Sequence, residues 1–147
     1  MSNAFEGDLV RPLGFVTLYF AYAEYELDLL LAHLSPLEPF DEAKRQWQVG
    51  RKLTLGEDVL RRFHNGGSAG QEELFSDGRA LFERRNRLVH SCVFAGGRVV
   101  SSRPGVPEWR TSPKELMELA ERIFAWKEHL HVYRWRVIEP LLSKRGS

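Results

Sequence analysis

The spacing of apolar residues in two long segments, 8–34 and 113–142, constrains the fold more than any other feature. In both segments apolar side chains recur at steps of three and four residues, which is the periodicity of one face of an α-helix. The first helix also has apolar residues on its other side, so we expect it at the centre of a bundle or covered by a second subunit. Its predicted core stripe comprises Leu13, Val16, Phe20, Leu27, Leu31 and Leu34.

Two further helices are predicted between these segments. Residues 41–64 favour a helix in two pieces, and a new piece is expected to begin at Thr54, because Thr54 and Glu57 have the spacing of a capping box. The glycine-rich residues 64–70 are typical of a linker. A third helix is predicted over residues 71 to about 89.

The apolar period changes after the third helix. Residues 91–102 contain short apolar runs on either side of Gly96 and Gly97, which predicts a small two-stranded β-hairpin. Ser112 then has the context of a helix N-cap, with Pro113 directly after it. Because the connections favour antiparallel neighbours, we expect an all-α fold, a four-helix up-and-down bundle with the hairpin between the third and fourth helices.

Length and charge narrow the class of protein. A chain of 147 residues has the size of one domain, so we expect residues 1–147 to form a single domain with disordered tails at 1–7 and 143–147. The formal net charge is only +1, so nucleic-acid binding would have to depend on local basic clusters. A single cysteine excludes an intramolecular disulfide, and the acidic residues within 24–28 argue against a membrane span. These features favour a cytoplasmic protein without membrane association.

The stretch "LFERRNRLVHSCVF", residues 81–94, places an unusual amount of charge in an apolar segment. On a helical wheel Arg85 points within about 10° of the centre of the buried stripe, whereas Arg84 and Arg87 fall outside it. A buried guanidinium must find acceptors, because an unpaired buried charge is costly. Glu24 lies inside the stripe of the first helix and is a candidate partner. Arg85 is therefore either half of a structural ion pair or a functional arginine.

Three polar residues share one side of the third helix if the helix persists to residue 90. Asn86 and His90 are four residues apart, and Glu83 is seven residues before His90. Asn86 could hydrogen-bond the imidazole of His90 and select its tautomer, as a catalytic histidine requires. The simpler interpretation, a capping or surface histidine, stays open.

The residues "RRNRLVHS" resemble the signature of the HEPN superfamily, in which an arginine is followed by a polar residue and, after four to six intervening positions, by a histidine. Arg85, Asn86 and His90 match this pattern with four intervening residues. The helical bundle and the place of the motif near the end of the third helix are also similar, and the resemblance covers about residues 8–142. It implies a metal-independent endoribonuclease without a cofactor, often a toxin or antiphage effector, that works as a homodimer with two motifs facing one cleft.

The resemblance also implies roles for these residues on RNA. Arg85 would hold the scissile phosphate, and His90 would take the proton of the ribose 2′-hydroxyl or give one to the leaving oxygen. Asn86 would orient the substrate or the imidazole. Glu24 and Glu83 are supporting residues by their helix positions, independently of the resemblance. Family members silenced by a partner nucleotidyltransferase antitoxin carry a tyrosine where this chain has Cys92, so the likeness to that subclass is incomplete. The alternative is a non-catalytic helical dimer that binds RNA or a protein partner, in which Arg85 is held by Glu24.

Further basic residues are candidates for substrate binding. Lys127 and Arg134 lie seven residues apart in the apolar stripe of the last helix, and with Arg87 they could contact RNA. Alternatively, their long stems pack at the edge of the core. His129 and His131 would point about 160° apart on a helix, so no joint metal site is expected from them.

Overall fold

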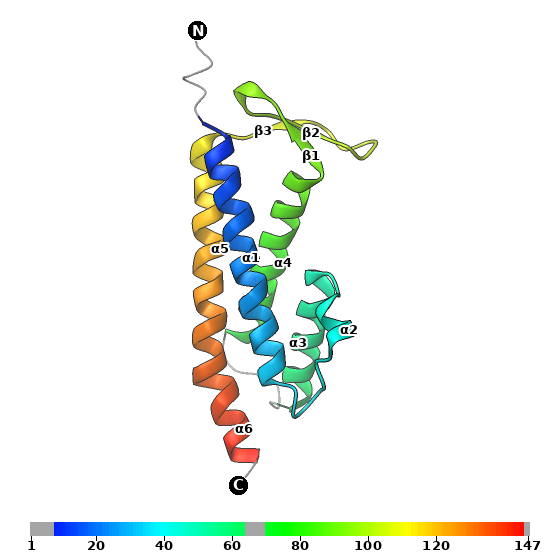
Figure 1. Cartoon of the computed structure of the whole chain (residues 1–147), viewed down its shortest axis with the longest axis vertical. Coiled ribbons are helices and arrows are strands. Elements are labelled where there is room, and N and C mark those ends of the chain that lie inside the picture. Colours follow the sequence, from blue (N-terminus) through cyan, green and yellow to red (C-terminus); the bar gives the residue numbers. More distant parts are fainter. Residues whose placement is uncertain (1–7, 64–69, 146–147) are drawn as a thin grey trace.

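The computed structural model describes residues 8–63 and 70–145 and is mostly helical, as the sequence predicted (Figure 1). The long helices are α1 (Val10–His33), α3 (Val49–Phe63), α4 (Gln71–Val89) and α5 (Pro113–Tyr133). The shorter helical elements are α2 (Glu42–Arg45), a 3-10 turn (Ala95–Gly97), a π-helical segment (Arg134–Ile138) and α6 (Glu139–Arg145). The strands are β1 (Ser91–Val93), β2 (Arg98–Ser101) and β3 (Trp109–Arg110).

Some predicted segments lie partly or wholly outside the described residues. The expected tail at 1–7 and all but the last residue of the linker at 64–70 lie outside the described residues, as do residues 146–147. Residues 143–145, expected to be part of a C-terminal tail, belong to α6. Among the described helices, none has an apolar stretch that could cross a membrane.

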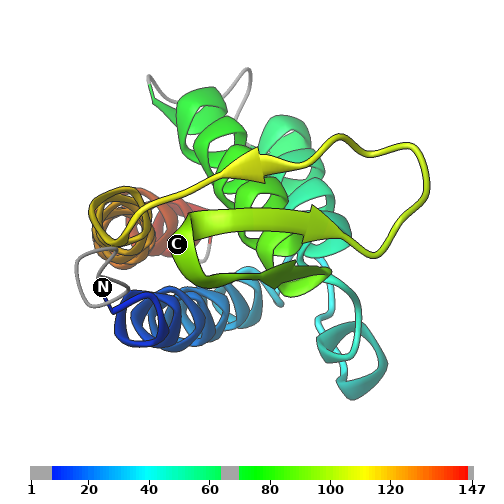
Figure 2. The ribbon, with the colours of Figure 1, turned by 90° about the horizontal axis from the view of Figure 1, so that it is seen from above.

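Helices α1 and α5 lie side by side and run in the same direction (Figure 2). Tyr19 packs edge-on against Phe124 with 5.1 Å between ring centroids, and further along Glu26 contacts His131 at 3.3 Å. In both pairs the partner lies 105 residues later in the chain. A constant separation of this kind is possible only between parallel helices.

The chain order corrects the predicted up-and-down bundle. Gly50 of α3 lies against Phe82 of α4, whereas Gly56 lies against Phe75, so α3 and α4 are antiparallel. Helices α1 and α3 are parallel, because the segment 34–48, which includes α2, returns the chain along the bundle before α3 begins. Among the long helices α4 alone therefore runs against the others (Figure 1).

Three predicted helix boundaries are confirmed, and one segment differs. Helix α4 spans residues 71–89 as expected, and the Ser112 Oγ accepts the backbone N–H of Glu115 at 3.1 Å to cap α5. The last helix was expected from about residue 113 to 142, and a π-helical segment interrupts it between α5 and α6. The ring of Pro140 would clash with a carbonyl in a regular α-helix, which favours a wider turn just before it.

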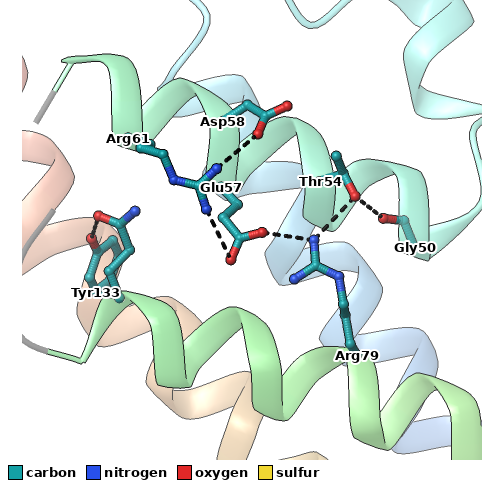
Figure 3. A network of polar contacts seen from close by, with 8 residues as sticks. Gly50, Thr54, Glu57, Asp58, Arg61, Arg79 and Tyr133 are labelled. Carbon is teal, nitrogen blue, oxygen red and sulfur yellow. Dashed lines mark hydrogen bonds and ion pairs between the residues drawn. The ribbon is translucent and has the colours of Figure 1, made fainter. Parts of the chain in front are cut away.

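The prediction that a helix begins at Thr54 is wrong, because Thr54 lies inside α3. Its hydroxyl donates to the carbonyl of Gly50 at 3.1 Å, and it accepts a hydrogen bond from Arg79 of α4 at 3.1 Å (Figure 3). Arg79 also donates to Glu57 at 2.9 Å. The two residues that resembled a capping box therefore join α3 to α4. The break between the two helical pieces falls at residues 46–48.

The predicted hairpin is confirmed and is extended by a third strand. Strands β1 and β2 are antiparallel, with Cys92 opposite Val100, and β3 adds to the free edge of β2. A Cβ on Gly97 would lie 1.9 Å from the carbonyl oxygen of Thr111, so only glycine fits the turn. Two-residue β3 was too short to give a sequence pattern. The sheet lies across the end of the bundle at which α4 finishes (Figures 1 and 2).

Candidate functional site

Arg85 is half-buried on the side of α4 that faces α1. Its guanidinium carbon lies 4.6 Å from the centre of the Phe20 ring, and its Nε is buried without a hydrogen-bond partner in the described part of the chain. The helical wheel thus predicted the side of α4 correctly, but Arg85 is half-buried and not at the centre of the core. The expected ion pair with Glu24 is not formed, because the Glu24 carboxylate contacts the Lys52 ammonium at 3.1 Å.

Lys52 is the residue that sequence reasoning missed in this region. Its side chain is only 1% exposed, and its ammonium lies 3.1 Å from Glu24 and 2.9 Å from Asp28. A lysine in an amphipathic helix normally extends to solvent, so nothing in the local sequence predicted its burial. Because Lys52 holds both carboxylates, the guanidinium of Arg85 remains available to an external anion.

Arg85 opens onto a pocket of about 430 Å³ between α1, α3, α4 and the loop after β2. We call it the site pocket, and the predicted residues Arg85, Asn86 and His90 all line it. The structure therefore brings the three motif residues together. The full lining is Glu24, Gln48, Val49, Phe82, Arg85, Asn86, His90 and Arg103.

His90 stands at the junction of α4 and the sheet. Its backbone N–H donates to the Asn86 carbonyl at 3.1 Å, and its carbonyl accepts the N–H and hydroxyl of Ser102 at 3.0 and 2.8 Å. The backbone is thus held from both elements, while the side chain is exposed. No hydrogen bond joins the imidazole to the Asn86 side chain within residues 8–63 and 70–145, so the expected choice of tautomer by Asn86 is not seen.

A smaller pocket of about 280 Å³ adjoins the site pocket and shares Asn86, His90 and Arg103 with it. Glu83 lines this pocket, as expected from its shared helix side with Asn86 and His90. Arg87 lines it too and lies 5.8 Å from the Trp109 ring. Polar side chains from α4 and from the β2–β3 loop therefore surround one continuous surface.

Arg103 is a second arginine in the site that the motif did not indicate. It lies on the loop after β2, and its backbone N–H donates to the Ser101 hydroxyl at 3.1 Å. Ser101 pairs with Ser91, so the hairpin returns the chain to the end of α4 and carries Arg103 to the imidazole side. The hairpin register, centred on the predicted glycine turn, was the signal that could have found it.

Lys127 and Arg134 do not join this site. Lys127 lies 3.3 Å from Glu128 and 4.1 Å from the Phe124 ring, and Arg134 lies 4.9 Å from the Trp135 ring. Helices α4 and α5 are antiparallel, so the end of α5 lies beside the beginning of α4, far from the end that carries the motif (Figure 1).

The electrostatic character of the site pocket favours an anion. Two guanidinium groups, Arg85 and Arg103, and the imidazole of His90 line it, while Lys52 compensates the one acidic residue, Glu24. Within the described ranges no three His, Cys, Asp or Glu side chains gather closely enough to hold a metal ion. Comparisons of the chain with protein-family models, curated proteins and solved structures found no significant match.

Proposed function

We propose that this chain is a metal-independent endoribonuclease of the HEPN type, with the site pocket as its active site. The observation that carries the proposal is the buried, unpaired Nε of Arg85 in a pocket shared with Asn86 and His90. A guanidinium with unused donors favours binding of a phosphate, which offers several acceptor oxygens. RNA supplies such a phosphate next to a 2′-hydroxyl nucleophile.

The chemistry assigned to the pocket is an internal transesterification. The 2′-oxygen forms a bond to phosphorus while the bond to the 5′-oxygen breaks, which leaves a 2′,3′-cyclic phosphate and a 5′-hydroxyl. His90 accepts the proton of the 2′-hydroxyl or donates one to the leaving oxygen. Arg85 and Arg103 stabilise the charge that develops on the phosphate, and Asn86 orients the substrate.

A second copy of the chain belongs to this proposal, because one imidazole cannot be base and acid in the same step. The outer face of α1 offers a surface for it, since no charged residue occurs between Arg11 and Glu24. Leu18, Tyr22 and Tyr25 on this helix are 44%, 46% and 64% exposed. Glu24 lines the site pocket, so a copy packed on α1 would stand beside the site.

The alternative function, a non-catalytic helical dimer, assumed that Glu24 holds Arg85. The contact of Glu24 with Lys52 removes that assumption and leaves Arg85 free in the pocket. We therefore favour the catalytic proposal, and the experiment below separates the two.

The test is incubation of the pure protein with total RNA in EDTA, beside Arg85→Ala and His90→Ala variants. We expect cleavage by the parent and a loss of about 100-fold or more in either variant, because each removes a group that acts in the transition state. Arg84→Ala is the matched control, since Arg84 is the exposed neighbour and does not line the site pocket. Absence of cleavage by the parent, or cleavage that survives both substitutions, would contradict the proposal.

A further inference from the structure

A tryptophan with two nearby cations lies at the edge of the site pocket. Trp47 is half-buried in the turn between α2 and α3, with the Arg51 guanidinium carbon 3.7 Å from its ring centre and the Lys44 ammonium 6.0 Å from it. The next two residues, Gln48 and Val49, line the site pocket. An aromatic ring and positive charge therefore lie next in the chain to two residues that line the site pocket.

This corner is held firmly against the rest of the site. Val49 is buried, and a Cβ on Gly50 would lie 3.6 Å from the ring of Phe82, which lines the same pocket as Arg85. Arg51 itself is exposed and has no ion-pair partner in the described part of the chain. Its guanidinium stacks on one face of the half-buried Trp47 ring, so the pair presents an exposed cationic plane next to an aromatic one.

We propose that Trp47 and Arg51 form a base-stacking subsite, which binds an unpaired nucleobase of RNA next to the phosphate held at Arg85. Aromatic rings and guanidinium planes are the surfaces on which single-stranded bases stack. The identity of the ligand rests on the proposed ribonuclease function. The loop that carries Arg103 projects on the same side of the molecule as α2, so the strand would pass between the two (Figure 1).

The subsite predicts a preference for single strands. A base must leave its helix before it can stack on Trp47, so a duplex of the same sequence binds more weakly. We assign the preference for single strands to Trp47 and Arg51, because phosphate contacts alone do not recognise bases.

The test measures binding of a fluorescein-labelled eight-nucleotide RNA to the full chain carrying His90→Ala, which prevents turnover. Adding Trp47→Ala is expected to weaken binding about tenfold or more, and Trp47→Phe to restore part of it. Trp135→Ala is the matched control, because Trp135 also contacts an arginine but lies in the π-helical segment, where it packs against His33 at the end of α1. Circular dichroism establishes that each variant is folded, and Arg51→Gln provides a second variant of the same subsite.

An RNA with one abasic position identifies the group that is recognised. If a base stacks on Trp47, removing that base from the RNA and substituting Trp47→Ala lower the binding free energy by less together than the sum of the two separate losses. Three results would overturn the subsite. The His90→Ala chain does not bind the RNA, adding Trp47→Ala leaves its binding unchanged, or adding Trp135→Ala weakens binding as much as Trp47→Ala does. RNA binding that depends on Trp47 without any cleavage by the unsubstituted chain would support the subsite and contradict the ribonuclease. If the unsubstituted chain cleaves RNA and Trp47→Ala changes neither cleavage nor binding, the ribonuclease is supported and the subsite is contradicted.

Discussion

Two arginines that lie near opposite ends of α4 have nearly the same immediate surroundings. Arg85 and Arg134 are both half-buried, each has a buried Nε without a hydrogen-bond partner among the described residues, and each lies against an aromatic ring at 4.6 and 4.9 Å. They differ in their neighbours. Arg85 shares a pocket with His90 and Asn86, whereas Arg134 belongs to the π-helical segment after α5. An unpaired guanidinium therefore suggests a site only where groups of complementary chemistry surround it.

The largest effect is expected from the residue that keeps Arg85 unpaired. Lys52→Met leaves Glu24 and Asp28 without their cation and should lower the free energy of unfolding by about 3 kcal/mol. The released Glu24 would also be free to pair with Arg85, so RNA cleavage by the folded fraction should fall. Urea titration and a cleavage assay measure the two effects.

Lys127→Met is the control for this prediction. Lys127 also lies on a long helix, but its partner is the adjacent Glu128 and its side chain is more exposed. We expect a change below about 1 kcal/mol. Equal losses in the two variants would show that the contacts of Lys52 with the two carboxylates have no special importance.

The next effect tests the difference between the two arginines directly. Arg85→Lys keeps the positive charge but loses the planar fork of donors, so RNA cleavage should fall about tenfold or more. Arg134→Lys should leave the rate within about twofold, since Arg134 lines neither the site pocket nor the smaller pocket beside it. Initial cleavage rates of the two variants on one RNA substrate measure this difference. A comparable loss in both would show that Arg85 has no special role in cleavage.

The smallest effect is expected at Glu24. Glu24→Gln leaves Asp28 in contact with Lys52, and Glu24 is partly exposed, so the free energy of unfolding should fall by about 1 kcal/mol or less. Thermal or urea unfolding checks this. A loss as large as that of Lys52→Met would mean that Asp28 does not compensate for Glu24.

Much of the local structure could be predicted because its causes lie close together in sequence. The bounds of α4 follow from apolar periodicity, and the cap at Ser112 needs only the backbone N–H of Glu115 three residues later. The hairpin follows from two glycines between apolar runs. The half-burial of Arg85 follows from its place on a helical wheel, since that depends only on the rotation per residue.

The helix directions and the site partners were less predictable, since they depend on contacts between distant segments. Periodicity assigned a buried face to α1 and α3, but it does not indicate whether residues 34–48 return the chain or continue it. In the parallel arrangement that results, the carboxylate of Glu24 contacts Lys52 and not Arg85. Thr54 and Glu57 were assigned to a capping box because the position of Arg79 on another helix was unknown.

By itself the sequence determined the helical class, most element boundaries and the common location of Arg85, Asn86 and His90 near the end of one helix. These properties follow from backbone geometry and side-chain spacing within a single segment. Only the tertiary structure decided that Glu24 pairs with Lys52, that Arg103 completes the pocket and that Lys127 and Arg134 lie elsewhere. Such pairings depend on how the helices pack and in which direction each one runs, and no local pattern encodes that choice.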